Sequence, residues 1–467
     1  MKKVFAFLLA AALMLSLVGC GAKADPSGDG TSGGKATALK VSDEFLESLK
    51  GLEMTIVYPW SIDESNVDTE AYDYKHLKEL EKQYGFTVKT VGQGSGYESA
   101  MVTAVMSGAP LGNVMMCPEN DFADWYYAGI MSNLNSAAAE LGIDFANDAI
   151  YNKVVSKYTN VDGGQYGFNF GYENTAYTSL YYNKRILAEN DLEDPHTLQE
   201  KGEWTWDKLK EYAKKCQVAE SDGTITLHGY GAWTINETLT AMIYSNDGDY
   251  CKINADGQLE VNLKDPKTTQ AMETYYDWCN TDKTIYVSEG GWKAAMQDFV
   301  NGSYAFMLGT NEVMTIANDS GMKDEFGMIA FPKGPSNTSN ITSYQSNVRY
   351  WFIPVTYEKD AAKYLFIMDL IRRSDTRTYD ERFEDDFFLK IADEASYEDY
   401  KKRLSGNDKY SLYAYSGISY LDGGCFFGLS NDMYYGYKTA GTLIDMYADS
   451  LNANLRDVWG ETKITGK

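Results

Sequence analysis

The chain is poor in histidine and in positive charge. Its 467 residues include only three histidines, His76, His196 and His228, far apart in the sequence. Metal centres built on histidine, and pairs of histidine with a serine or cysteine nucleophile, are therefore disfavoured. Lys and Arg number 42 against 67 Asp and Glu, a net charge of −25. Such a surface lacks a basic face that could neutralise a run of phosphates, which excludes nucleic-acid binding.

Cysteine spacings typical of metal sites are also missing. The six cysteines include no C-x-x-C pair, so we predict no zinc motif, no metal site and no cofactor. We interpret most of them as small buried side chains, with one disulfide left open. No internal repeat is visible. Aromatic residues, by contrast, are abundant at 14% of the chain. Many belong in a core, but amphipathic rings also suit a protein that binds something flat and hydroxylated.

The first 20 residues have the pattern of an export signal. Lys2 and Lys3 precede an apolar run that ends at Val18, too short to span a bilayer comfortably. The ending Leu-Val-Gly-Cys resembles the lipobox of bacterial lipoproteins, in which cleavage precedes the cysteine and its sulfur is lipidated. We predict a signal peptide over residues 1–19, then lipidated Cys20 and a flexible tether to residue 40. An ordinary signal that ends in cysteine is the alternative.

Strands and helices alternate after the tether. We predict strands at 52–58, 86–91 and 114–116, a helix at 75–84 and a second helix that ends at Gly108. This order predicts a mostly parallel, doubly wound α/β sheet that binds ligands at the carboxyl ends of its strands. The loops at those ends are 60–66, 92–97 and 117–121. The glycine-rich turn at 92–96 lacks the nucleotide-binding spacings, so nucleotide binding is disfavoured.

A second alternating series predicts a second α/β lobe. It includes strands at 178–182 and 304–308 and a helix capped by Thr205. A helix that starts at Asp265-Pro266 and another at 292–301 complete it. The C-terminal third reads as mainly helical, at 360–373, 376–392 and 432–455. Asp247-Gly248-Asp249 lacks the other ligands of a calcium loop and is interpreted as a hairpin turn.

Several segments in this second series resemble family 1 extracellular solute-binding proteins, the receptors of ABC importers for sugars and oligosaccharides. They are LYYNKRIL at 180–187, Asp194-Pro195, WTWD at 204–207, FVNGSYAFM at 299–307 and FGMIAFPKGP at 326–335. The resemblance covers essentially the whole mature chain. At 110–114 the chain has Pro-Leu-Gly-Asn-Val where the family commonly has Pro-Asp, which leaves the local loop geometry open.

The resemblance implies the two-lobe periplasmic-binding-protein fold of type II, the venus-flytrap fold, with a helical C-terminal part. A maltose-binding member, used as a distant template, places crossing segments near 171–174, 341–347 and 394–400. The implied N-terminal lobe comprises residues 41–172 and 345–395, and the C-terminal lobe residues 173–344 and 396–467. The implied partners are a carbohydrate, permease subunits and, through the lipid anchor, the cell membrane. We expect a monomeric, extracytoplasmic, non-catalytic receptor.

Sugar rings need flat aromatic side chains for their faces and amides or carboxylates for their hydroxyls. The strand-end loops and the template together predict a ligand-binding set, although Cys117 and Thr238 depart from the template. The set is Trp60, Tyr97, Glu119, Asn120, Asp121, Asn174, Tyr177, Trp233, Asn236, Asn311, Glu312, Tyr434 and Tyr435. The alternatives are packing within a lobe for Trp60, Tyr97 and Trp233, and solvated turns for the charged and amide residues. Only one of Tyr434 and Tyr435 is expected to face the ligand.

Two other functions stay open. One is a receptor for a peptide or polyol, for which Arg349 beside Trp351 is the best-placed cation. The other is a lipid-anchored glycoside hydrolase, since carboxylate pairs at catalytic spacing arise readily among 67 acids. No residue marks such a pair as an acid and a base.

Overall fold

The structure is a computed structural model. It describes residues 39–62, 68–171, 176–346, 348–377, 381, 393–405, 409–410, 412–418 and 426–466. The predicted signal peptide, the tether as far as residue 38, Cys20 and Cys425 lie outside the described residues. Residues 36–467 belong to one compact unit.

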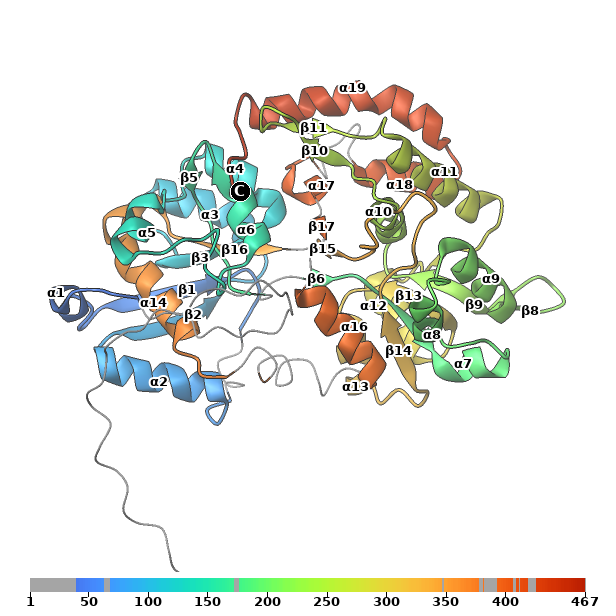
Figure 1. Ribbon diagram of the computed structural model, residues 1–467, viewed down its shortest axis with the longest axis horizontal. Helices are drawn as coiled ribbons and strands as arrows, with labels where there is room; N and C mark the ends of the chain where they lie inside the picture. Colours follow the sequence, from blue (N-terminus) through green and yellow to red (C-terminus); the bar gives the residue numbers. More distant parts are fainter. Residues whose placement is uncertain are drawn as a thin grey trace, which may run out of the picture. The chain divides into compact units, whose positions relative to one another are not determined.

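The first sheet has four strands in the order β16-β3-β1-β2 (Figure 1). They are β1 (Glu53–Tyr58), β2 (Thr87–Gly92), β3 (Val114–Pro118) and β16 (Arg349–Phe352). β1 pairs in parallel with both β2 and β3, whereas β16 is antiparallel to β3. The predicted parallel βαβαβ order is therefore confirmed. Because β1 to β3 run in the same direction, their carboxyl ends meet at one edge, where Pro59, Gln93 and Glu119 follow them.

The helices of this region connect the strands and pack on the sheet. They are α1 (Asp43–Glu47), α2 (Tyr72–Tyr84), α3 (Tyr97–Met106), α4 (Phe122–Tyr127), α5 (Asn135–Leu141), α6 (Lys153–Tyr158) and α14 (Ala361–Arg373), with 3-10 turns η2 (Glu119–Asp121) and η3 (Val355–Asp360). Helix α2 ends at Gly85, whose φ of +80° is the left-handed conformation that glycine adopts without penalty. This stop sets the start of β2, which begins two residues later.

The second sheet follows the order β12-β9-β13-β7-β14, with β8 at the side of β9. Its strands are β7 (Ser179–Asn183), β8 (Val218–Ala219), β9 (Ile225–Ala232), β12 (Tyr286–Val287), β13 (Tyr304–Gly309) and β14 (Phe326–Ile329). β9, β12 and β13 are mutually parallel, and β7 is antiparallel to β13 and β14. Every residue of β7 and β13 is buried, as expected for central strands covered on both faces.

The helices of the second region include the three that the sequence predicts. The helices described there are α7 (Lys184–Glu189), α8 (Pro195–Glu200), α9 (Trp206–Cys216), α10 (Ile235–Ser245), α11 (Pro266–Asn280), α12 (Gly291–Val300), α13 (Glu312–Asp319) and α16 (Glu394–Ser405). The three predicted ones are α9, α11 and α12. The Thr205 hydroxyl accepts from the N–H of Lys208, and the Asp265 carboxylate accepts from the N–H groups of Lys267 and Thr268. Both predicted caps are confirmed.

Short strands complete the topology. β6 (Ala176–Tyr177), β15 (Tyr344–Ser346) and β17 (Lys409–Tyr410) form a three-stranded sheet, while β4 (Asn160–Val161) pairs with β5 (Gly164–Gln165) and β10 (Cys251–Ile253) with β11 (Leu259–Val261). Strand β6 follows the expected crossing segment at 171–174 in sequence, and β15 lies within the one expected at 341–347. The lobe boundaries themselves stay a prediction.

The C-terminal helices differ from the expectation. After α17 (Leu412–Tyr415), the chain forms α18 (Phe426–Tyr434) and α19 (Ala440–Trp459), so the single helix predicted over 432–455 is wrong. Gly436 has a φ of +70°, which ends the first helix. The Thr439 hydroxyl then accepts from the N–H of Thr442 and begins the next. The helix predicted over 376–392 lies almost wholly outside the described residues.

Candidate functional site

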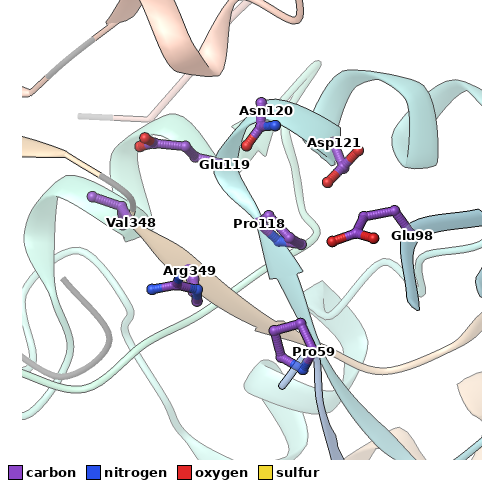
Figure 2. Close-up of a pocket in the computed structure, with 8 residues that line it drawn as sticks. All are labelled: Pro59, Glu98, Pro118, Glu119, Asn120, Asp121, Val348 and Arg349. Atoms are coloured by element: carbon purple, nitrogen blue, oxygen red, sulfur yellow. The ribbon is translucent and has the colours of Figure 1, made fainter. Parts of the chain in front are cut away.

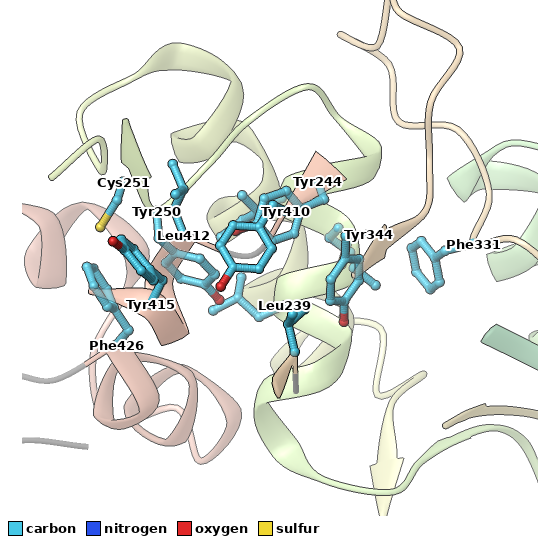
Figure 3. Close-up of a cluster of buried hydrophobic side chains, with 14 of the residues drawn as sticks. Leu239, Tyr244, Tyr250, Cys251, Phe331, Tyr344, Tyr410, Leu412, Tyr415 and Phe426 are labelled. Atoms are coloured by element: carbon cyan, nitrogen blue, oxygen red, sulfur yellow. The ribbon is translucent and has the colours of Figure 1, made fainter. Parts of the chain in front are cut away.

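A cavity of about 260 Å³ lies at the carboxyl edge of the first sheet. Pro59 follows β1 directly, and Pro118 is the last residue of β3, where it pairs in register with Arg349 of β16. Three strands thus converge on the cavity. Its lining is Pro59, Glu98, Pro118, Glu119, Asn120, Asp121, Val348 and Arg349 (Figure 2). Glu119, Asn120 and Asp121 of the predicted set therefore lie together.

Trp60 stands beside this cavity with its ring partly open to solvent. Its side chain is 41% exposed, so it is not packed in the core of the sheet. The guanidinium carbon of Arg349 lies 5.4 Å from the centre of the indole, and the ring of Tyr58 lies 5.0 Å away. An arginine over an indole is a favourable arrangement that also fixes the orientation of the ring. The platform interpretation of Trp60 fits this placement better than core packing.

Two carboxylates of the cavity face one another. Figure 2 shows the side chain of Glu98, from the first turn of α3, directed toward that of Asp121, at the end of η2. Burial, together with the negative charges of Glu98 and Asp124, raises the pKa of Asp121 from 3.8 to about 6. Within the described residues, neither Glu98 nor Asp121 forms a side-chain hydrogen bond or ion pair, and Oδ2 of Asp121 is buried. This part of the cavity is rich in unused acceptors.

Glu119 and Arg349 form the other charged part of the lining. Glu119 is only 3% exposed. Burial lowers the pKa of Arg349, and the nearby negative charges of Glu119 and Glu312 oppose that change. The positive charge of Arg349 is therefore balanced by acids, one from the first region and one from the second.

Tyr97 does not reach the cavity. Its ring is completely buried, and its hydroxyl donates a hydrogen bond to the carbonyl oxygen of Met116. Burial also raises the pKa of the phenol. Tyr97 therefore packs in the core, which is the alternative to ligand binding that the sequence left open. The next residue, Glu98, lines the cavity instead. The sequence analysis did not select Glu98, although it lies in the first turn of the same helix, α3.

A second group of predicted residues gathers at the carboxyl edge of the second sheet. Trp233 follows β9, and its backbone N–H donates to the carbonyl of Leu308 in the parallel strand β13. Asn311 and Glu312 follow β13 at the start of α13; Asn311 is half-buried and Glu312 is exposed. Parallel pairing of β9 and β13 thus brings these residues to one edge.

Trp233 has an aromatic partner that the sequence analysis did not select. Trp292, 39% exposed, meets it edge to face at 6.4 Å between ring centres. In the described part of the chain, the buried indole nitrogen of Trp233 and the buried hydroxyl of Thr310 have no hydrogen-bond partner. Such groups are costly unless something pairs with them. The exposure of Trp292 at the start of α12 could be suspected from its place at a helix start after a strand.

The remaining predicted residues are placed less favourably or lie outside the description. Asn236 is buried, and its side-chain oxygen accepts from the hydroxyl of Thr234. The hydroxyl of Tyr434 accepts from the N–H of Val287, whereas Tyr435 is 56% exposed and stacks on Tyr437. Asn174 and the side chain of Tyr177 lie outside the described residues.

Other chemical sites are scarce in the described residues. They contain no group of three or more His, Cys, Asp or Glu side chains placed to hold a metal ion. Four cysteines are described, and all are free thiols: Cys117, Cys216, Cys251 and Cys279. None of the helices described is both long and apolar enough to cross a membrane. The turn at Asp247 is held by ion pairs with Lys409 and Lys267.

Solved structures share this architecture. A cyclic alpha-maltosyl-1,6-maltose binding protein from Arthrobacter globiformis is 14% identical, with a TM-score of 0.61 over 87% of this chain and 99% of that one. An ABC substrate-binding protein from Listeria monocytogenes, in complex with cycloalternan, is 17% identical with a TM-score of 0.57 over 88% and 99%. A cyclo/maltodextrin-binding protein complexed with maltotetraose is 14% identical, with a TM-score of 0.60 over 86% and 97%. At these identities the likeness shows the fold, the two-lobe type II fold that was expected.

Comparison with curated protein sequences gives no match. The sequence model of one family, described as bacterial extracellular solute-binding protein, matches residues 75–367, which is more than half of the chain. The matched span includes β2, β3, β16, α3 and η2 of the first region and the whole second sheet, whereas β1 precedes it. The resemblance found in the sequence is thereby confirmed, and the chain belongs to the bacterial extracellular solute-binding proteins.

Proposed function

We propose that this chain is the lipid-anchored receptor of an ABC importer, which captures a sugar or oligosaccharide and delivers it to a membrane permease. The observation that carries the proposal is the cavity edge of the first sheet. There an open indole, Trp60, stands beside carboxylates and an amide, Glu119, Asn120 and Asp121. A sugar needs this combination, because its C–H face stacks on a ring while its hydroxyls donate to and accept from polar groups.

The second edge supplies complementary groups. Trp233 and Trp292 offer ring surface, and Asn311 and Glu312 offer polar atoms at the end of β13. In the proposed mechanism a solute bound at one edge gains the contacts of the other only when the lobes close on it, so binding shifts the population to the closed form. A Kd near about 1 μM, or about 8 kcal/mol, lies within reach of two ring contacts and several hydroxyl bonds.

The membrane anchor is the second part of the proposal. It rests on the residues before the folded unit, where Cys20 follows an apolar segment and a glycine-rich stretch separates it from β1. A flexible tether lets the receptor sample its surroundings while it stays near the permease. The permease receives the closed form, and the receptor itself carries out no reaction.

A thermal-shift screen tests the proposal. The mature chain with Cys20→Ser is heated with mono- and oligosaccharides, with peptides and polyols as controls. A ligand that binds only the folded state raises the melting temperature. A rise with one sugar series, without release of a product, supports the receptor. A rise with peptides or polyols alone would reject the sugar, and release of a product would reject the non-catalytic role in favour of a hydrolase.

A further inference from the structure

Two carboxylates, Glu98 and Asp121, line one side of the cavity, and neither forms an ion pair within the described residues. Glu98 and Asp121 approach from different elements, α3 and η2, and face one another in Figure 2. The other titratable groups that interact electrostatically with Asp121 are Asp124 on α4, the thiol of Cys117 on β3 and the phenol of Tyr97 on α3, and none of them is cationic. The cavity and the open ring of Trp60 mark the site; the acid pair determines what the site prefers.

The positive charge of Arg349 in the cavity lining is already balanced by nearby acids. Arg349 belongs to β16 and lies over Trp60, with Glu119 and Glu312 as its nearby acids. In Figure 2 Glu119 and Arg349 lie on one side of Pro118, and Glu98 and Asp121 lie on the other. With one positive and three negative side chains, the lining disfavours an anionic solute.

We infer that the solute bound at this cavity presents a protonated amine to Glu98 and Asp121, as an amino sugar does. The inference rests on the proposed function and names the class of sugar. A neutral hydroxyl can donate to one carboxylate, but it does not relieve the repulsion between two carboxylates held face to face. An ammonium group donates up to three hydrogen bonds and neutralises the pair.

A metal ion is the other cation that two carboxylates suggest. Calcium takes about six to eight oxygen ligands, and magnesium needs about six in a regular octahedron. The described residues contain no group of three or more His, Cys, Asp or Glu side chains placed to hold a metal ion, here or elsewhere. An organic cation such as an ammonium group needs fewer ligands, and two carboxylates can satisfy it.

Free acid groups also make the expected binding depend on pH. The raised pKa of Asp121, about 6, means that its carboxyl is largely protonated at pH 5. An ammonium group competes with that proton, so affinity for the amine should fall several-fold between pH 7.5 and pH 5. A neutral sugar, which bonds to either form of the carboxyl, should show a much smaller change.

The experiment is calorimetric titration of the purified full-length protein in detergent. The probes are matched series with the same ring and linkage: glucosamine, galactosamine and mannosamine with their β-1,4 trimers, the neutral parent sugars, the N-acetyl forms and the uronates. We expect the amine member of at least one series to bind about tenfold more tightly than its neutral and N-acetyl partners. The uronates should not bind.

Variants test the assigned residues. Glu98→Gln with Asp121→Asn should reduce the amine-to-neutral affinity ratio to within about threefold, and should abolish the pH dependence. Glu79→Gln, an exposed acid on α2 of the same lobe, is the control and should leave that ratio unchanged. An unchanged ratio in the double variant, with normal melting, would overturn the assignment.

The outcomes separate this inference from the proposed function. A neutral sugar that binds as tightly as its amine overturns the amine and keeps the sugar receptor. Binding of a uronate also overturns the amine and keeps the sugar receptor. If no sugar of any series binds in calorimetry while a peptide raises the melting temperature in the thermal-shift screen, both the amine sugar and the proposed function are rejected.

Discussion

Replacing Asp121 by asparagine should stabilise the ligand-free protein at neutral pH. A rise in the pKa of Asp121 from 3.8 to about 6 means that the folded state holds the proton more tightly than the unfolded state does. The ionised carboxylate is therefore destabilising above pH 6. About two units at about 1.4 kcal/mol each give about 3 kcal/mol. Because the side chain is partly exposed, solvent screening reduces this to about 1–1.5 kcal/mol.

Two local effects decide whether the stabilisation survives. Asp121 precedes α4, but its side chain makes no capping hydrogen bond there, so Asp121→Asn removes none. A negative charge at a helix start is worth about 0.5 kcal/mol, which is smaller than the expected gain. The net result should be about 1 kcal/mol of added stability.

The pH profile provides the check. Urea unfolding of the ligand-free mature chain, wild type against Asp121→Asn, should show the difference at pH 7.5. The difference should shrink as the pH falls below 6 and vanish near about pH 3, below the unfolded pKa of 3.8, where the carboxyl is protonated in both states. Glu79→Gln should show no such profile. Equal stability of wild type and Asp121→Asn at pH 7.5, or a difference that does not change with pH, would refute a desolvated Asp121.

Three further outcomes are expected. Trp233→Ala should lower sugar affinity at least about tenfold in calorimetry with only a small change in melting temperature; loss of folding with intact affinity would place Trp233 in the core. Cys20→Ser should move the protein from the membrane to the soluble fraction in a fractionation immunoblot, and continued retention would contradict lipidation. Asp247→Asn should reduce the free energy of unfolding by about 1–2 kcal/mol in urea titrations, because half-buried Lys409, 2.7 Å away, would lose its ion-pair partner. A loss below about 0.5 kcal/mol would contradict that account.

The first sheet could be predicted because the residues that start and end its helices and strands lie within or next to those elements. Gly85 ends α2 within the chain segment that forms it, and the apolar alternation of β1 needs no knowledge of distant residues. The long C-terminal helix was wrong for a related reason. Its apolar spacing continues across Gly436, and only the left-handed φ of that glycine shows that the chain turns there. The spacing of apolar residues predicts which face of a helix is apolar, but it does not show every residue at which a helix ends.

The site was less predictable than the fold because it depends on register. The strand-end rule led to Tyr97, but a rotation of one residue along α3 places Tyr97 in the core and Glu98 in the cavity. Arg349 lies more than 200 residues downstream of Pro118. It reaches the same cavity because β16 lies antiparallel beside β3, which pairs Arg349 with Pro118. The sequence singled out Arg349 as a cation, but its neighbours Glu119 and Glu312 emerge only from the folded chain.

The two strand edges carry different chemistry, and this difference bears on how a receptor of this kind would discriminate solutes. The first edge offers acceptors, with Oδ2 of Asp121 buried and unpaired in the described chain, and the second offers the equally unpaired indole N–H of Trp233. A buried polar group without a hydrogen-bond partner raises the free energy of the state in which it stays unpaired. In the proposed mechanism, a solute that donates at one end and accepts at the other relieves both penalties, but one that only donates relieves one. Selectivity would then come from matching both edges rather than from the depth of one cavity.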